Sequence, residues 1–281
     1  MSTKTITTTW NLGGDLTINR LGYGAMQLAG KGVFGEAKDR EGAKKVLQAA
    51  VAGGVNFIDT AEAYGPKLNE SLIADALHPY PKGLVIATKG GFDRPGPDQW
   101  IPNGHPNHIR ENIEGSLKRL KVDTIDLWQL HRIDSKVPVE ETLAPVAAAV
   151  KAGKIRHVGL SEVNIEQIER AEKVVPIVSV QNLYNLGNRQ WESVLDYTVK
   201  RNIAFIPWFP LASGPDTLAD KIKGIAAAHN ATVAQIALAW LLKRADNILL
   251  IPGTSSLSHL QENLEAGDII LTDKEFEALS K

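Results

Sequence analysis

The sequence predicts an α/β fold, a (β/α)8 barrel of the TIM-barrel type with an N-terminal β-hairpin and a C-terminal helix. Eight short apolar runs of strand character recur along the chain, and segments of helical period lie between them. Strands that are apolar on both faces and alternate with helices indicate parallel β/α units. Eight units are the number that closes a barrel, whereas an open doubly wound sheet is the alternative with the same alternation.

The elements follow in order along the chain. TITTTWNL and DLTINR alternate polar and apolar residues around Gly13 and Gly14, which predicts the hairpin. Helical period is clear over 39–54, where Asp39 is the best N-cap, and over 107–120. The last stretch, LTDKEFEALSK, predicts a terminal helix capped by Thr272 or Asp273. The strand runs are residues 21–26, 55–60, 84–89, 125–131, 155–161, 177–182, 203–209 and 248–254.

Composition limits the kind of protein. No linker or shift in composition divides the chain, so residues 1–281 are expected to form one domain. The 31 basic and 32 acidic side chains are well mixed, which argues against a nucleic-acid surface or a polybasic membrane patch. The absence of cysteine excludes disulfides and cysteine-ligated metals. MSTKTITTTW lacks the apolar core of a secretory signal, and no apolar run reaches membrane-spanning length, so a cytoplasmic location is expected.

GKGVFG, residues 30–35, has the spacing G-x-G-x-x-G of a dinucleotide-binding turn. That turn begins at the end of a strand and ends at the start of a helix. Here the apolar run ends too early, near Met26, and Gly35 is followed by the charged stretch EAKDRE. A pyrophosphate there would meet Glu36 and Asp39 rather than a free helix N-terminus. We interpret the segment as a loop between a strand and a helix.

Four side chains at strand ends carry the candidate chemistry. In a β/α barrel the functional residues lie where strands end and loops begin. Asp59 and Tyr64 follow the second strand run, Lys89 ends the third and His131 ends the fourth. Each alone is ordinarily a turn former, a surface aromatic, a solvated charge or a structural histidine. Together they converge on one rim of one barrel.

Their chemistry fits the reduction of a carbonyl group. A tyrosine hydroxyl has an ordinary pKa of about 10 and is a poor acid at neutral pH. The Lys89 ammonium stabilises a phenolate, so we expect it to make Tyr64 a better proton donor. Asp59 is expected to pair with Lys89, and His131 to hydrogen-bond the substrate carbonyl. A hydride then reaches the carbon while Tyr64 delivers a proton to the oxygen.

FIDTAEAYG (57–65) with NE at 69–70, VIATK (85–89), DLWQLH (126–131) and IRHVGLSE (155–162) resemble the aldo-keto reductase family. The resemblance runs from about Arg20 to Asn263. It implies a TIM barrel that uses NAD(P)H without a Rossmann domain, with a catalytic tetrad at Asp59, Tyr64, Lys89 and His131. The opening LGYGAMQLAG and the closing LLIPGTSSLSHLQENL are most similar to the pyridoxal reductase (pyridoxine 4-dehydrogenase) branch.

The resemblance also implies where the cofactor binds. The nicotinamide stacks on Trp208, and Ser161 and Gln181 hydrogen-bond its carboxamide. Glu162 departs from the family, in which Asn is common beside that serine, and a carboxylate only accepts hydrogen bonds. The implied cofactor positions are Gly24, Ala25, Met26, Asp59, Ser161, Gln181, Trp208, Phe209, Leu211, Ser213, Gly253, Thr254, Ser255, His259, Glu262 and Asn263.

The adenosine half of the cofactor is expected over PGTSSLSHLQEN, residues 252–263, where backbone N–H groups and hydroxyls at a helix start form an anion site. The positions that face the 2′-phosphate are Gly253, Thr254, Ser255 and His259, and those at the adenine are Glu262 and Asn263. Many members carry Lys and Arg where this chain has Gly253 and His259. NADPH is the expected cofactor, and NADH is the alternative.

The substrate site is the least readable part of the sequence. Trp100, Phe34, Trp128 and Phe209 are candidates to line an apolar pocket, and the alternative for each is packing in the core or in a loop. The resemblance implies small aldehydes or ketones as substrates, pyridoxal among them. No metal is expected, since the histidines at 78, 105, 108, 131, 157, 229 and 259 form no H-x-H or HExxH motif.

Two other functions remain open from the sequence. In a barrel lyase, Lys89 would be a Schiff-base nucleophile and no nicotinamide would be needed. Barrels of this family also occur as cofactor-holding regulatory subunits of ion channels, with a stable partner and very slow turnover. Borohydride trapping of a substrate on Lys89 tests the first, and the turnover rate tests the second.

Overall fold

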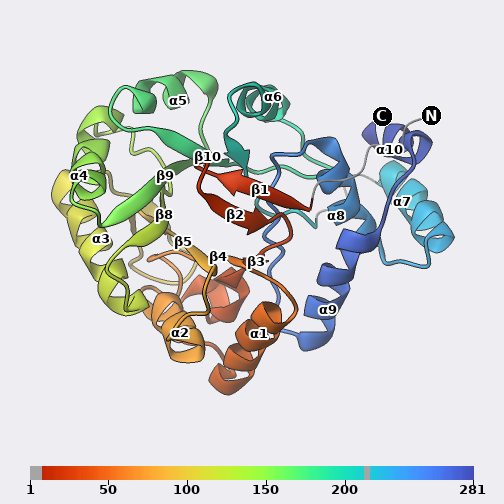
Figure 1. Ribbon diagram of the computed structural model, residues 1–281, viewed down its shortest axis with the longest axis horizontal. Coiled ribbons are helices and arrows are strands. Elements are labelled where there is room, and N and C mark those ends of the chain that lie inside the picture. Colours follow the sequence, from red (N-terminus) through yellow and green to blue (C-terminus); the bar gives the residue numbers. More distant parts are fainter. Residues whose placement is uncertain (1–7, 212–215) are drawn as a thin grey trace.

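The computed structural model describes residues 8–211 and 216–281. The chain begins with the predicted hairpin, in which β1 (Thr9–Leu12) pairs antiparallel with β2 (Leu16–Asn19). The strands that follow form a ring surrounded by helices, and the hairpin lies across the middle of that ring (Figure 1).

A parallel sheet forms the centre of the fold. Its strand order is β11-β10-β9-β8-β5-β4-β3. These strands are β3 (Tyr23–Gly24), β4 (Phe57–Asp59), β5 (Val85–Gly90), β8 (Ile125–Leu130), β9 (Ile155–Ser161), β10 (Ile177–Gln181) and β11 (Ala204–Phe205). The two outermost strands are joined through the segment around Leu249, because parallel bridges pair Phe205 with Ile248 and Leu21 with Leu250. The sheet therefore closes into a barrel, and the open doubly wound alternative is wrong.

The eighth predicted strand, 248–254, is reduced to those two bridges. Leu249 N donates to Phe205 O in β11, and Gly22 N, just before β3, donates to Leu250 O, so the segment is hydrogen-bonded on both sides. Pro252 has no backbone N–H to donate, so beyond Leu250 this pairing is reduced to one bond, from Gly24 N to Pro252 O at 3.4 Å. The segment closes the barrel although it forms no extended strand of its own.

Helices surround the barrel and connect its strands. Asp39 caps α1 as predicted, accepting a hydrogen bond of 2.9 Å from Gly42 N. Of the two candidates for the last cap, Thr272 is the N-cap and Asp273 is the first helical residue. The α-helices are α1 (Arg40–Ala52), α2 (Leu68–Leu77), α3 (Pro106–Leu120), α4 (Val139–Lys151), α5 (Ile165–Glu172), α6 (Glu192–Lys200), α7 (Asp216–Ala228), α8 (Val233–Arg244), α9 (Leu257–Glu265) and α10 (Asp273–Ser280).

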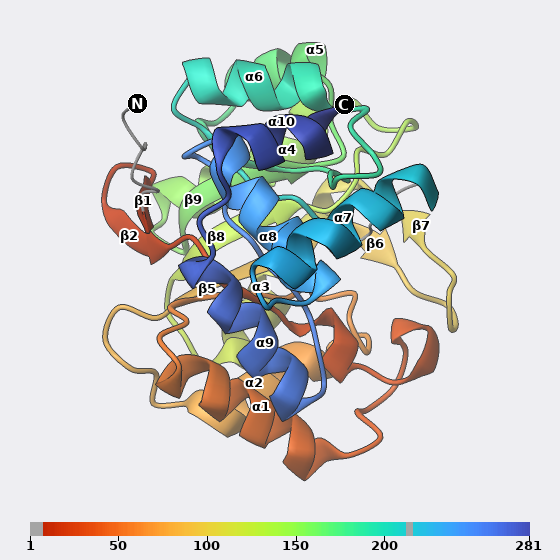
Figure 2. The same ribbon diagram turned by 90° about the vertical axis from the view of Figure 1, so that its right-hand side faces the viewer.

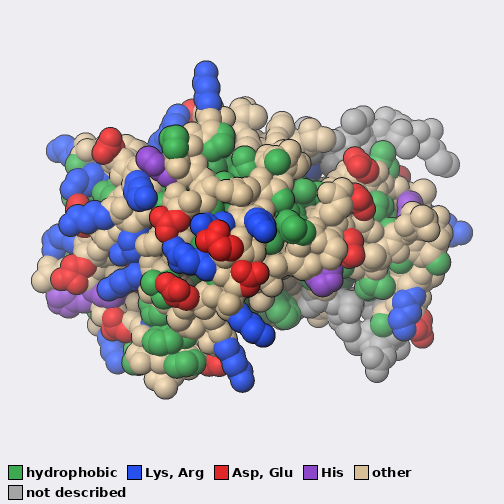
Figure 3. Space-filling view, turned by 90° about the horizontal axis from the view of Figure 1, so that it is seen from below, with side chains coloured by type: hydrophobic (Ala, Val, Ile, Leu, Met, Phe, Trp, Pro, Cys, Tyr) green, Lys and Arg blue, Asp and Glu red, His purple; other side chains and the backbone are tan. Residues whose placement is uncertain are grey.

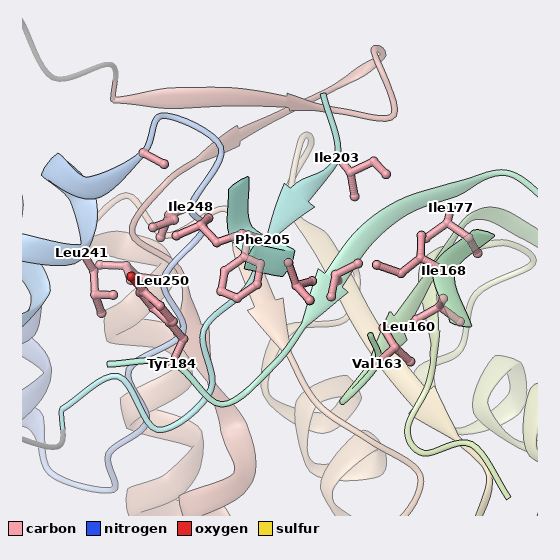
Figure 4. Close-up of a cluster of buried hydrophobic side chains, with 14 of the residues drawn as sticks. Leu160, Val163, Ile168, Ile177, Tyr184, Ile203, Phe205, Leu241, Ile248 and Leu250 are labelled. Atoms are coloured by element: carbon pink, nitrogen blue, oxygen red, sulfur yellow. The ribbon is translucent and has the colours of Figure 1, made fainter. Parts of the chain in front are cut away.

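A large apolar core fills the space between the sheet and the helices. Successive strand residues point to opposite faces, so each strand supplies every second side chain to this outer layer. Phe205, Leu160 and Ile177 come from the strands, while Ile168 and Leu241 come from α5 and α8 (Figure 4). This packing fixes the positions at which the strands end.

The hairpin closes one end of the barrel. Leu12 and Ile18 pack in one buried cluster with side chains inside the ring, among them Phe57, Leu127 and Leu249. A short ribbon of β6 (Phe92–Asp93) and β7 (Ile101–Pro102) follows β5. Hairpin and ribbon lie at opposite ends of the barrel (Figure 2). The carboxyl ends of the strands are therefore left for a site that the ribbon borders.

Charged side chains of both signs are interspersed on the face of the molecule shown in Figure 3. Within the described ranges, no single helix is both long and apolar enough to cross a membrane. Two consecutive helical segments, Ala219–Ala228 and Val233–Arg244, are long and apolar enough only when they are counted as one span, and a bend of 92° separates them.

Candidate active site

A cavity of about 340 Å³ opens at the carboxyl ends of the strands. The predicted residues that line it are Gly24, Met26, Asp59, Tyr64, Trp100, His131, Ser161, Gln181, Trp208, Phe209, Leu211 and Gly253. This is the end of the barrel that the hairpin leaves free. This geometry confirms the prediction that the residues at the strand ends converge on one rim of the barrel.

Asp59, Lys89 and Tyr64 form one buried hydrogen-bonded group. Lys89 Nζ lies 2.5 Å from Asp59 Oδ1 and 3.4 Å from Tyr64 Oη, and it also donates to Thr60 O at 2.9 Å. All three side chains are buried. The His131 ring lies edge-on to the Tyr64 ring, with centroids 5.8 Å apart. The structure thus brings together all four residues of the expected tetrad.

The backbone explains this arrangement. Asp59 and Lys89 lie at the ends of neighbouring parallel strands, where alternation turns both side chains into the barrel. Tyr64 sits in the turn after β4, and its backbone N–H donates to Ala61 O. Glu62 N donates to Lys89 O, which ties this turn to the end of β5. A short loop therefore brings the phenol back over the ammonium.

Two amides hold the Asp59 carboxylate from the other side. Gln129 Nε2 and Gln181 Nε2 each donate to Asp59 Oδ2 at 3.0 Å. With Lys89 on Oδ1, both carboxylate oxygens have donors. Such a fully bonded carboxylate keeps a buried ammonium in place.

Burial changes the expected acidity of Tyr64. Burial raises the pKa of Tyr64, the Lys89 ammonium lowers it, and the net pKa lies above the ordinary value. The effect of Lys89 thus has the predicted sign, and the loss of hydration on burial outweighs it. Burial also lowers the pKa of Lys89, while Asp59 and Tyr64 raise it to a net value above the ordinary one. At neutral pH the site therefore holds a protonated phenol beside a charged ammonium.

His131 is held neutral. Its pKa lies well below the ordinary value because of burial and because Lys89, Arg132 and Arg94 are positively charged neighbours. Phe92 packs against the ring, with centroids 4.7 Å apart. A neutral imidazole in this position can serve as a hydrogen-bonding group toward a carbonyl oxygen.

The carboxyl of Glu62, near the site, is buried, and the effect of that burial on stability can be measured. Burial raises the pKa of this carboxyl from 4.5 to about 7, so the folded protein retains a proton that the unfolded chain releases at lower pH. Glu62 therefore lowers the free energy of unfolding progressively as pH rises from 4.5 to about 7. Above that range the loss of stability is complete and stays constant. We expect Glu62→Gln to stabilise the protein at pH 8 by at most about 3 kcal/mol and to be nearly neutral below pH 4.5.

Urea unfolding of Glu62→Gln at both pH values measures this difference. The exposed Glu277→Gln is the control, because it removes the same charge without the burial. Equal stability changes for Glu62→Gln at both pH values would show that this carboxyl titrates normally.

Family profiles and relatives agree with this geometry. The profile described as the Aldo/keto reductase family matches residues 20–281. The chain belongs to the aldo/keto reductase family. An uncharacterised oxidoreductase of Schizosaccharomyces pombe is 48% identical over 95% of this chain and 88% of its own length. Pyridoxine 4-dehydrogenase of Escherichia coli is 41% identical over 93% of each chain.

The fold is shared as well. The crystal structure of an aldo-keto reductase from Klebsiella pneumoniae in complex with NADPH superposes with a TM-score of 0.82 at 27% identity. The match covers 98% of this chain and 94% of the other. As an aldo/keto reductase, this protein is an oxidoreductase with a TIM-barrel fold.

In this aldo/keto reductase, the departure at Glu162 has a structural explanation. Glu162 Oε1 accepts hydrogen bonds from Trp208 Nε1 at 2.7 Å and from Leu183 N at 2.5 Å. The carboxylate thus holds the indole that the resemblance assigns to the nicotinamide. This contact could not be predicted from the sequence, because Glu162 and Trp208 follow different strands.

The remaining predicted cofactor positions lie in several settings. Thr254 and Ala25 are buried, Ser255 and His259 are exposed at the start of α9, and Glu262 and Asn263 lie further along that helix. None of these six lines the cavity. The α9 N-cap is Ser256, whose Oγ accepts from His259 N at 3.5 Å. Ser213 lies outside the described residues.

Two predicted pocket residues lie elsewhere. Trp128 is fully buried in the core outside the ring, because its neighbours Leu127 and Gln129 take the inward positions on β8. Phe34 does not line the cavity; Arg94 lies over its ring at 5.9 Å. For these two residues the alternative of core or loop packing holds. Trp100 and Phe209 do line the cavity.

The GKGVFG segment is a loop, as interpreted from the sequence. Residues Lys31–Val33 form one 3-10 turn that includes Gly32 at φ 68°, and no strand leads into it. Arg94 fastens this loop from the other side of the site, donating to Gly32 O at 2.9 Å and to Ala63 O at 2.7 Å. The same guanidinium lies 3.5 Å from the centre of the Trp100 ring, which fixes that pocket wall.

Sequence reasoning missed several residues of the site. Gln27, Arg132, Pro210 and Ile251 line the cavity, and Gln129 supports Asp59. Arg132 could have been predicted, because it directly follows His131 at the same strand end. Among residues 8–211 and 216–281, no three His, Asp or Glu side chains are grouped as metal ligands would be.

Proposed function

We propose that this protein reduces small aldehydes and ketones to alcohols with NADPH, and that Tyr64 is the proton donor. The observation that carries this proposal is the position of Tyr64, which lines the cavity and whose Oη lies 3.4 Å from the Nζ of the buried, ion-paired Lys89 behind it. A phenol that stays protonated beside a fixed ammonium is suited to donate its proton as charge develops on a carbonyl oxygen.

The cavity has the groups that a dinucleotide needs. Trp208 offers a flat apolar face held by Glu162, and Ser161 and Gln181 offer polar atoms in the same wall. Beyond Gly253, the start of α9 presents backbone N–H groups and the positive end of its helix dipole, which suits phosphates. The NADPH complex of the Klebsiella pneumoniae relative supports the same assignment.

Each residue of the tetrad then has one task. NADPH, when bound, supplies the hydride to the carbonyl carbon. Tyr64 donates its proton to the carbonyl oxygen, and Lys89 stabilises the phenolate that remains. Asp59 keeps Lys89 charged and aimed, while neutral His131 hydrogen-bonds the carbonyl oxygen and orients it. A proton from solvent restores Tyr64, so the alcohol forms with one hydride and one proton consumed.

Pyridoxal is the substrate that we propose to test first. The identity of 41% with Escherichia coli pyridoxine 4-dehydrogenase supports it. Fluorescence titration with NADPH and NADH, followed by a panel of aldehydes that includes pyridoxal, tests the function. An absence of nicotinamide binding, or of carbonyl reduction across the panel, would overturn the proposal.

The Schiff-base alternative fits this geometry poorly. A lysine nucleophile must lose its proton, whereas Asp59 and Tyr64 raise the pKa of Lys89. Lys89 is also fully buried behind Tyr64 and Asp59. Borohydride should therefore trap no substrate on this lysine.

A substitution at the start of α9 tests the cofactor preference. We expect His259→Arg to strengthen NADPH binding relative to NADH by about fivefold or more, because an arginine fork pairs with a phosphate. The measurement is the ratio of the two dissociation constants. Gln261→Arg adds the same charge two residues further along α9 and should leave that ratio nearly unchanged. An unchanged ratio in His259→Arg would place the 2′-phosphate elsewhere.

A further inference from the structure

Arg132 lines the cavity but has no task in the steps proposed above. It follows β8 directly after His131. Its Nη1 donates to His131 O at 2.6 Å and to Ser161 Oγ at 2.9 Å, so one end of the guanidinium is fixed. Within the described ranges, no residue accepts a hydrogen bond from Nη2 or Nε, and no carboxylate lies within ion-pair distance. An arginine has five N–H donors, so part of this fork is unused.

Aromatic rings hold the guanidinium at the reacting end of the cavity. Its central carbon lies 5.9 Å from the Phe92 ring centre and 5.8 Å from the Trp208 ring centre. Phe92 packs on His131, and Trp208 is the proposed nicotinamide platform. Arg132 therefore lies beside the group that we expect to bind the carbonyl, close to where hydride transfer would occur.

The charges around this position favour an anion. The Lys89 ammonium is matched by Asp59 at 2.5 Å. The charge of Glu162 stabilises the Arg132 guanidinium from beyond ion-pair distance, while its Oε1 accepts from Trp208 and Leu183, so Glu162 leaves the free N–H groups of Arg132 unbonded. Arg94 and Arg132 add positive charge around His131. A negatively charged substrate group here would gain a charge-assisted hydrogen bond at a partly buried position.

We infer that Arg132 is a specificity-determining residue, which binds an ionised oxygen that the substrate carries near its carbonyl group. This inference rests on the proposed carbonyl reduction and names the substrate class more closely: aldehydes that bear a carboxylate or an ionised ring hydroxyl. The guanidinium fork suits both groups, since each presents oxygen lone pairs to two N–H donors. Pyridoxal, with a ring hydroxyl next to its aldehyde, belongs to this class.

Matched substrates test the inference on the unaltered enzyme. We compare kcat/KM for 3-carboxybenzaldehyde and its methyl ester with NADPH, and for 2-hydroxybenzaldehyde and its methyl ether at about pH 9. The electron-withdrawing aldehyde next to the hydroxyl lowers the pKa of this phenol below the ordinary value of about 10, so it is largely ionised at that pH. We expect the anionic member of at least one pair to be favoured by about tenfold or more. The favoured pair identifies carboxylate or phenolate as the group that Arg132 binds.

Substitutions then assign the preference to Arg132. Arg132→Met should lower the charged-to-neutral ratio by about tenfold or more, and Arg132→Lys should retain part of it. Arg110→Met removes an equal charge from the exposed side of α3 and should leave the ratio unchanged. The ratio is informative even if Arg132→Met is less stable, because both substrates are measured on the same protein.

Three results would overturn the inference. The first is an unaltered enzyme that shows no preference within either pair. The second is a loss in Arg132→Met that is equal for both members of a pair and accompanied by weaker NADPH binding, which would assign Arg132 to the cofactor. The third is that neither charged nor neutral aldehydes are reduced, in which case the proposed function fails as well. Turnover of the neutral ester and ether would show that carbonyl reduction holds and that only the role of Arg132 is wrong.

Discussion

Tyr64→Phe is expected to lower kcat for carbonyl reduction by about two to four orders of magnitude, the usual contribution of a positioned proton donor. The substitution removes one hydroxyl from a buried ring and leaves the ring's contacts with Trp100 and His131 in place. NADPH affinity should change by less than about threefold, because the lost interaction is made with the carbonyl oxygen. Steady-state kinetics and fluorescence titration measure the two quantities.

Tyr80→Phe is the matched control for this experiment. Tyr80 donates its hydroxyl to Leu120 O at 2.7 Å, away from the cavity, so the same atom is removed without touching the site. Its kcat should equal that of the unaltered enzyme. Unchanged turnover in Tyr64→Phe would remove Tyr64 as the proton donor.

Lys89→Met should be the most destabilising single change in the site. It leaves the Asp59 carboxylate buried with two amide donors but no positive charge, a loss of about 3–5 kcal/mol for a broken buried pair. Activity should also fall by at least about a hundredfold, because nothing then stabilises the Tyr64 phenolate. Urea unfolding and steady-state kinetics measure the two effects.

A double substitution separates stability from chemistry. Asp59→Asn with Lys89→Met removes both charges, so it should recover much of the lost stability but none of the activity. If Lys89→Met alone is as stable as the unaltered protein, the pair is not a buried ion pair of the kind described here.

The spacing of apolar runs was sufficient to predict the barrel. Each run is long enough to form a strand and too apolar to face water on either side. Because helical segments connect consecutive runs, the strands are expected to pair in parallel. The same spacing overestimated the last strand. Pairing at Ile248 and Leu250 depends on how the two ends of the sheet meet, and Pro252 then limits it, so local propensity could not define its extent.

The meeting of Asp59, Tyr64, Lys89 and His131 could also be predicted, because parallel strands bring their carboxyl ends to one rim. What could not be predicted is how deeply the side chains at that rim are buried. The net pKa of Tyr64 depends on the balance between burial and the Lys89 charge, and burial is a property of the whole fold. Trp128 shows the same limit, since a single register position decides whether a side chain faces the cavity or the outer core.

The sequence by itself determined the barrel, the four side chains at its rim and the kind of chemistry that they support, because these follow from local period and residue type. Only the tertiary structure decided which partners those groups meet. Glu162 on Trp208, Gln129 and Gln181 on Asp59, and the unused fork of Arg132 all join strand ends that are distant in the chain. Contacts of this kind depend on distances of a few ångströms across the barrel, which residue spacing along a chain does not specify.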